Sequence, residues 1–62
     1  MTTPDLTPRQ RQVCHLLATG LIDKEIAAKL GLSKRTVESH VANGMQKVKA
    51  RTRAQYVIIV LT

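Results

Sequence analysis

The sequence has 62 residues and is expected to form a single domain, residues 1–62. A core of this size contributes only a few kcal/mol of net stability unless a disulfide, a metal or a partner subunit adds to it. Cys14 is the only cysteine, and no Cys/His cluster has metal-ligand spacing, which excludes an internal disulfide and a structural metal. Self-association is therefore expected. Asp23 and Glu25 lack a third acidic group or a histidine at useful spacing, so neither an enzyme nor a cofactor is predicted.

Ten Lys and Arg residues against four acidic ones give a formal net charge of +6 and a pI near 10.3. This balance favours a polyanionic partner, although charge alone leaves DNA and RNA equally open. Tyr56 is the only aromatic residue, whereas RNA and single-strand modules usually stack bases on aromatic rings, which favours duplex DNA. The sequence shows no signal peptide and no apolar run of about 18 residues, so no membrane association and a cytoplasmic location are expected.

The first helix is expected over roughly residues 8–19. Thr7, Pro8 and Gln10 fit an N-cap, a first-turn proline and the third-position amide of a capping box. Gly20 is a natural C-terminal stop, because glycine adopts the left-handed conformation without a side-chain clash. The apolar face of this helix comprises Val13, Leu16, Leu17 and Leu21.

A helix-turn-helix is predicted to follow. Asp23 is placed as the cap of a second helix, with Glu25 in its first turn complementing the helix dipole. Gly31 ends this helix, and Ser33 caps a third helix that begins at Lys34. Two helices joined through a three-residue turn that starts with glycine are typical of the helix-turn-helix motif.

The third helix, about residues 34–48, has two contrasting faces. At 100° per residue, one face forms a core stripe of Val37, Val41, Gly44 and Val48. The opposite face carries Arg35, Ser39, Ala42 and Gln46. A merely solvated face is usually rich in long charged groups, whereas small and polar side chains suit a helix that enters a groove. The cations gather instead at the two ends, where they can meet phosphates of both strands; they are Lys34, Arg35, Lys47, Lys49, Arg51 and Arg53.

A fourth helix is predicted from Arg53 towards Leu61, capped by Thr52 and Gln55. Its last five residues are aliphatic and cover every side of the helix, yet a small core can face only one side. We expect Ala54, Val57, Ile58 and Leu61 to face the core. The remaining apolar residues would form a homodimer interface; they are Tyr56, Ile59 and Val60.

The segments LTPRQRQV, GLIDKEIAAKLGLSKRTVESHV and KVKARTRAQ, in this order and spacing, resemble the DNA-binding domain of the LuxR/FixJ (GerE-like) transcription regulators. The similarity covers residues 6 to about 58. It implies an all-α, four-helix LuxR-type helix-turn-helix domain whose third helix reads the major groove and whose fourth helix commonly mediates dimerisation.

The resemblance also implies roles for individual residues. Matching positions give base contacts at Glu38, Ser39 and Ala42, with Asn43 adjacent to them. Glu38 can accept a hydrogen bond from a cytosine amino group, or it is a solvated carboxylate that repels phosphates. Phosphate-side or groove-edge positions match Lys34, Arg35, Thr36 and Lys47; the outer face and the basic end of the helix add Gln46, Lys49 and Arg51.

The sequence departs from the family pattern at three positions. Gln10 replaces a usual Glu, which keeps the capping geometry and removes a charge. Gly44 stands at a packing position, where the helix is either loosened or closely approached by another backbone. Lys49 stands where a glycine normally ends the third helix, which predicts that the helix runs on or ends by a different motif. The family usually joins this domain to a receiver or ligand-binding domain, and these residues contain neither.

The leading hypothesis is a sequence-specific regulator of transcription that binds an imperfect palindromic operator in double-stranded DNA as a homodimer. The alternative is a protein-interaction module whose apolar last helix sequesters a related full-length regulator. A third hypothesis is non-specific nucleoid or RNA binding, which predicts affinity that ignores sequence.

Overall fold

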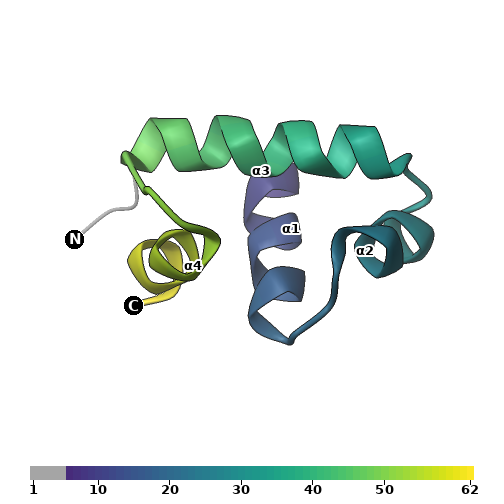
Figure 1. Cartoon of the computed structure of the whole chain (residues 1–62), viewed down its shortest axis with the longest axis horizontal. Helices are drawn as coiled ribbons and strands as arrows, with labels where there is room; N and C mark the ends of the chain where they lie inside the picture. The colour runs from purple at the N-terminus through teal and green to yellow at the C-terminus, as the bar shows by residue number, and fades with distance from the viewer. Residues whose placement is uncertain (1–5) are drawn as a thin grey trace.

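The computed structural model describes residues 6–62, which form four helices and no strand. The helices are α1 (Pro8–Ala18), α2 (Asp23–Leu30), α3 (Lys34–Val48) and α4 (Arg53–Leu61). The longest helix, α3, lies across the other three, with α1 beneath its middle and α2 and α4 on either side of α1 (Figure 1). The prediction of an all-α, four-helix domain is confirmed, and α3 and α4 have the predicted bounds.

Three of the four helices begin at the predicted caps. The Thr7 hydroxyl accepts the Gln10 N–H at 3.1 Å, and the Gln10 side chain accepts the Thr7 N–H at 3.0 Å, which completes a capping box. The Ser33 hydroxyl accepts the Thr36 N–H at 3.0 Å at the start of α3. At α4, the Thr52 hydroxyl accepts the Gln55 N–H at 3.0 Å, but the Gln55 side chain reaches past Thr52 to the N–H of Arg51. These bonds satisfy amide groups that a helix start leaves unpaired.

The cap of α2 differs from the prediction. Ile22 is the capping residue, and Asp23 is the first residue of the helix. The Ile22 N–H donates to the Glu25 carboxylate at 3.0 Å, so Glu25 completes half of a capping box without a side-chain acceptor at the cap. The Asp23 carboxylate does not cap the helix and instead binds Arg53 of α4.

The turn between α2 and α3 depends on Gly31, whose φ is 69°. Beyond it, the Leu32 N–H donates to the Ala27 carbonyl at 2.9 Å and satisfies the end of α2. The chain then enters α3 at Ser33, so only three residues separate the two helices. The turn of the helix-turn-helix is as predicted.

The core lies where α1, α2 and α4 meet the inner face of α3. Val37, Val41 and Gly44 of the predicted core stripe are buried, and Val48 is half-buried. Cys14 is fully buried among apolar side chains, and its burial raises the pKa of the thiol. The buried apolar residues are Leu6, Val13, Cys14, Ile26, Ala27, Val37, Val41, Tyr56 and Val60.

The predicted orientation of α4 is wrong. Tyr56 and Val60 were expected on the outside, but they are 0% and 6% exposed and belong to the core. Conversely, Ala54 and Ile58 were expected inside and are exposed. The helix is thus rotated so that positions 56 and 60, with the half-buried 57 and 61, face inward. Tyr56 and Val60 therefore cannot form the outer surface of α4, whereas Ile59 can.

A close contact between Tyr56 and Gly44 explains this rotation. A Cβ atom added at Gly44 would lie 2.0 Å from the Tyr56 hydroxyl oxygen and 2.6 Å from its ring carbon Cζ. The ring therefore packs on a surface of α3 that only glycine leaves free, and Gly44 is approached by a side chain rather than by another backbone. Burial raises the pKa of Tyr56, and its hydroxyl has no hydrogen-bond partner within the described structure.

We predict that Gly44→Ala destabilises the domain by about 1–3 kcal/mol, because the new methyl group collides with a ring that is fully buried. The adjacent variant Asn43→Ala is the control, since Asn43 is exposed and gains helix propensity without a collision. Chemical unfolding of both variants checks this. Equal or higher stability of Gly44→Ala would show that Tyr56 does not pack against Gly44.

Candidate nucleic-acid interface

The outer face of α3 gathers the predicted base-contacting residues on one exposed surface. Glu38, Ser39, Ala42 and Asn43 are all exposed, and so is Gln46 one turn further on. No residue of this face carries an apolar side chain larger than that of alanine. The 15 residues of α3 span about 22 Å, and a major groove about 12 Å wide admits an α-helix. This face is therefore free of packing within the domain, and its length and small side chains are compatible with the dimensions of a major groove.

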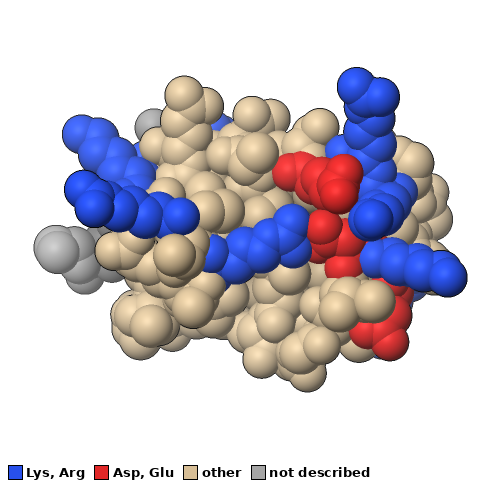
Figure 2. Space-filling model, viewed as in Figure 1, with Lys and Arg blue, Asp and Glu red and all other residues tan. Residues whose placement is uncertain are grey.

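Basic residues lie at both ends of α3. Lys34 and Arg35 are exposed at its start, and Lys47, Lys49 and Arg51 are exposed at and after its end. Along the upper edge that α3 forms in Figure 2, blue groups stand near both ends, with uncharged surface between them and one acidic group beside the blue groups on the right. This separation suits a helix whose middle faces bases and whose ends face phosphates.

Two of the predicted phosphate contacts are already engaged within the protein. The Thr36 hydroxyl is 2.8 Å from the Ser33 hydroxyl and is half-buried, so it stabilises the start of α3. The Lys47 ammonium group donates to the Gln10 side-chain oxygen at 3.2 Å, which ties the end of α3 to the start of α1. The role of Gln10 in this contact was not predicted, because 37 residues separate the two positions.

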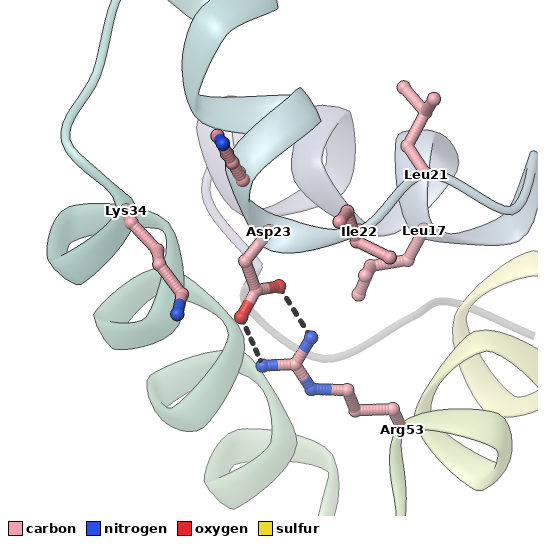
Figure 3. Close-up of a pocket in the computed structure, with 7 residues that line it drawn as sticks. Leu17, Leu21, Ile22, Asp23, Lys34 and Arg53 are labelled. Carbon is pink, nitrogen blue, oxygen red and sulfur yellow. Dashed lines mark hydrogen bonds and ion pairs between the residues drawn. The ribbon is translucent and has the colours of Figure 1, made fainter.

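An ion pair holds α2 and α4 together. The Arg53 guanidinium donates to both oxygens of Asp23, at 2.5 and 2.8 Å (Figure 3). The hydrogen bond from Arg53 lowers the pKa of Asp23 against the opposing effect of burial, and the charge of Lys34 lowers it further. The same hydrogen bond raises the pKa of Arg53, and the nearby Glu38 carboxylate contributes. Among the described helices, α2 and α4 do not otherwise pack together, so this pair joins them.

Lys34 is placed on the flank of α3 rather than along its outer face. It lies about 140° around the helix from Ser39 at 100° per residue. In Figure 3, its side chain points toward the Asp23–Arg53 pair. It helps to line an open hollow of about 490 Å³, whose other lining residues are Leu17, Leu21, Ile22, Asp23, Lys24 and Arg53.

The end of α3 carries backbone strain at a candidate phosphate contact. Lys49 has a φ of 59° and is the only residue other than glycine with a positive φ in the described part of the chain. The Lys49 N–H donates to the Gln46 carbonyl at 3.2 Å, and the Ala50 N–H donates to the Met45 carbonyl at 2.9 Å. This is the arrangement in which glycine usually ends a helix. The helix therefore neither runs on nor ends by another motif, so that prediction is wrong; instead, a lysine occupies the left-handed position.

Residues 6–62 hold no group of three His, Cys, Asp or Glu side chains that can bind a metal ion. No helix in the same range has the length and apolar character needed to cross a membrane.

We predict that Lys49→Gly stabilises the fold by about 1 kcal/mol, because glycine adopts the left-handed conformation without the cost of a side chain. The same change removes a cation at the end of α3, so affinity for duplex DNA should fall while the melting temperature rises. Differential scanning calorimetry and a DNA titration measure the two effects. Lys49→Ala is the control, since it removes the charge and keeps a side chain in the left-handed backbone conformation. If the melting temperature of Lys49→Gly is no higher than that of Lys49→Ala, the backbone at position 49 is not strained.

We predict a pH-dependent contribution from Asp23. Its pKa is lower in the folded state than in the unfolded chain, so the stabilisation is complete above the ordinary pKa of a carboxyl group and is lost as the pH falls through the folded-state value. Asp23→Asn should cost about 1 kcal/mol at neutral pH, a small value because the Arg53 side chain is 44% exposed and screened by solvent. The cost should vanish in strong acid. Unfolding in urea over a pH series checks this, and a cost that stays constant with pH would exclude the ion pair as its source.

Comparison with known proteins agrees with the sequence and the fold. The family model of bacterial regulatory proteins of the luxR family matches residues 4–60. The spore germination protein GerE of Bacillus subtilis is 43% identical over 58 residues, which cover 94% of this chain and 78% of GerE.

Two further relatives are much longer than this chain. The transcriptional regulatory protein UhpA of Escherichia coli is 58% identical over 43 residues, which cover 69% of this chain and 22% of UhpA. The nitrate/nitrite response regulator protein NarP of Escherichia coli is 41% identical over 56 residues, or 90% of this chain and 26% of NarP. The predicted resemblance is confirmed, and the family is one of regulators rather than enzymes. The chain belongs to the luxR family of bacterial regulatory proteins and carries its helix-turn-helix DNA-binding domain.

Proposed function

We propose that this domain regulates transcription by binding a specific sequence in duplex DNA, with α3 in the major groove. The observation that carries the proposal is the contrast along α3, which has a small, polar, exposed middle and basic groups at both ends. Membership of a family of regulators supports it. The partner that we propose is genomic DNA. We therefore also propose that the protein acts in the cytoplasm.

Each of the four exposed residues in the middle of α3 can contact a different group on the bases. Ser39 and Asn43 offer hydrogen-bond groups to base edges, and Ala42 offers a methyl group to thymine. Glu38 is exposed and can accept a hydrogen bond from the amino group of cytosine, but it lies close enough to Arg53 to raise the pKa of that side chain. Arg53 thus offsets the repulsion between Glu38 and the phosphates.

The cations at the two ends of α3 position the helix without reading sequence. Arg35, Lys49 and Arg51 are exposed and free to meet phosphates, together with Lys34 after a rotation of its side chain. Each phosphate that a cation neutralises releases a counterion and makes affinity fall with salt.

We predict that Ser39→Arg changes or abolishes the preferred DNA sequence, because Ser39 lies in the middle of the exposed face. Arg51→Ala should instead weaken binding to all duplexes alike and reduce the slope of log K against log salt by about 0.9, the value for one phosphate. Selection from randomised duplexes and titrations at several salt concentrations measure the two effects. An unchanged sequence preference after Ser39→Arg would remove α3 from the reading of bases.

We also propose that the domain acts as a homodimer formed through the outer surface of α4. Ile58 is 61% exposed and Ile59 is 37% exposed, and Ala54 lies one turn before Ile58. A domain whose core comes from so few residues gains stability by covering these side chains. The proposed interface therefore still includes Ile59, as predicted from the sequence. It includes Ile58 in place of the buried Tyr56 and Val60.

A two-fold dimer sets the form of the operator. Two copies of α3 would enter successive major grooves about 34 Å apart, on one side of the duplex. Symmetric proteins of this kind read symmetric half-sites, so the operator that we propose is an imperfect palindrome.

We predict that Ile58→Glu yields a folded monomer with greatly reduced affinity for a palindromic site, because the charge would be buried in the interface. Gln12→Glu, an exposed change on α1 that alters the net charge equally, should leave both the mass and the affinity nearly unchanged. Sedimentation and gel-shift titrations measure this. A wild-type protein that sediments as a monomer, free and on DNA, would exclude the dimer.

A further inference from the structure

The hollow beside the Asp23–Arg53 pair belongs neither to the surface proposed for DNA nor to the surface proposed for a second copy. It lies where the end of α1 meets the starts of the other three helices, and its volume is about 490 Å³. This volume is in the range of ligand-binding sites in proteins. Three of its seven lining residues are aliphatic and four are charged; they are Leu17, Leu21, Ile22, Asp23, Lys24, Lys34 and Arg53.

The apolar side of the hollow is not covered by the domain. Ile22 is 61% exposed, and Leu17 and Leu21 are half-buried. In Figure 3, these three side chains lie on one side of the ion pair, with Lys34 on the other. The backbone of Ile22 starts α2, but its exposed side chain adds little to the core. Exposed aliphatic groups bordered by charges are typical of a surface that binds another protein.

The charged side of the hollow has more cations than the domain neutralises. Asp23 is the only acidic residue that lines it, and both of its oxygens are bound to Arg53. Lys24 is exposed and makes no hydrogen bond or ion pair within residues 6–62. The charge of Lys34 lowers the pKa of Asp23, but no hydrogen bond or ion pair joins the two side chains. The hollow is therefore electropositive beside its apolar groups.

Arg53 also keeps the capacity to bind a further carboxylate. A guanidinium group has five N–H donors, and Asp23 accepts hydrogen bonds from only two of its nitrogens. The Arg53 side chain is 44% exposed, so a partner can reach the remaining donors.

The hollow stays accessible when the two proposed interfaces are occupied. At 100° per residue, Lys34 lies about 140° around α3 from Ser39, in the middle of the face proposed for DNA. Arg53 likewise lies about 140° around α4 from Ile58, in the surface proposed for the dimer. Lys24 belongs to α2, which takes part in neither interface. A third partner can therefore bind here while the domain is on DNA.

The form and chemistry of the hollow decide what kind of partner fits. Because the hollow is open, it cannot enclose most of a small molecule as ligand pockets do, and it suits a group presented by a larger partner. The DNA backbone supplies negative charge but no apolar group to cover Ile22. A protein segment with both carboxylates and an apolar side chain supplies both kinds of contact.

A second copy of this chain is a poor source of such a segment. Within residues 6–62 the acidic residues are Asp23, Glu25 and Glu38. The Asp23 carboxylate binds Arg53, and the Glu25 carboxylate accepts the Ile22 N–H at 3.0 Å. Glu38 lies on the face of α3 that is proposed for DNA. The segment is therefore expected to come from a different protein.

We propose that this hollow is a docking site for an acidic, amphipathic segment of another protein. Carboxylates of the segment bind Lys24 and Arg53, and an apolar side chain between them covers Ile22 and Leu17. The inference goes beyond the proposed DNA binding and does not rest on it. It gives a domain that occupies DNA a separate surface through which a partner protein is recruited.

The test selects peptides of about 12 residues, or three helical turns, from a random display library on the 62-residue protein. The enriched peptides should combine acidic residues with at least one large apolar residue. Their affinities are then measured by fluorescence anisotropy for the wild type and for two variants of the hollow, Lys24→Glu and Ile22→Ser. Lys29→Glu is the matched control, because Lys29 is also an exposed lysine of α2 but does not line the hollow.

Lys24→Glu and Ile22→Ser should each weaken binding of the enriched peptides about tenfold, as expected for residues at the centre of a contact. Lys29→Glu should change the affinity less than about threefold, the effect of a distant charge screened by salt. The melting temperatures should stay close to that of the wild type, since Ile22 and Lys24 are both exposed. Addition of a saturating duplex should leave the peptide bound.

Three results would overturn the inference. The hollow is not a docking site if the library yields no peptide whose affinity falls with both Lys24→Glu and Ile22→Ser. Its partner is not acidic if the peptides that depend on these residues lack carboxylates. The hollow belongs to the DNA surface if the duplex displaces the peptide. A protein that binds the peptides and no duplex would instead overturn the proposed function, so the two failures are distinguishable.

Discussion

The contact between the Tyr56 ring and Gly44 determines how the rest of the domain is assembled. Tyr56 is the only aromatic residue and the largest fully buried side chain, and it fits only because α3 has no Cβ atom at that position. The ring fixes the rotation of α4 about its own axis. That rotation decides which aliphatic residues of α4 close the core and which remain exposed, so the surface available to a partner follows from one packing contact.

Local chemistry accounts for what the sequence predicted well. The starts of α3 and α4 follow from Ser33 and Thr52, whose hydroxyl groups each accept a hydrogen bond from the amide three residues later. The turn follows from Gly31, which adopts the left-handed conformation without strain. The exposed face of α3 follows from helical periodicity alone. Each of these features depends on residues within a few positions of one another, so it can be predicted from the local sequence.

Two of the features that escaped prediction, the orientation of α4 and the binding of Asp23, depend on residues far apart in the chain, whereas the conformation of Lys49 is a local feature. Five consecutive aliphatic residues in α4 give no periodic signal, so the orientation of that helix needed the pairing of Tyr56 with Gly44, two residues that are individually conspicuous. Asp23 was placed as a cap because aspartate often is one, but a bidentate arginine 30 residues away takes its carboxylate. Lys49 adopts a glycine conformation because the backbone bonds that end α3 outweigh a cost of about 1–2 kcal/mol.

The same contacts link the proposed reading helix to the proposed dimer surface. α3 packs against α1, α2 and α4, with α1 beneath its middle and α2 and α4 on either side of α1 (Figure 1), and Gly44 lies on the α4 side. A rotation of α4 would press the Tyr56 ring against the backbone of α3, and a separation of the two helices would break the contact and expose the largest side chain of the core. The Asp23–Arg53 pair restrains the start of α4 relative to α2 in the same way. The angle between α3 and the outer face of α4 is therefore fixed by the core of each copy, and in a dimer that angle would set the spacing of the two reading helices.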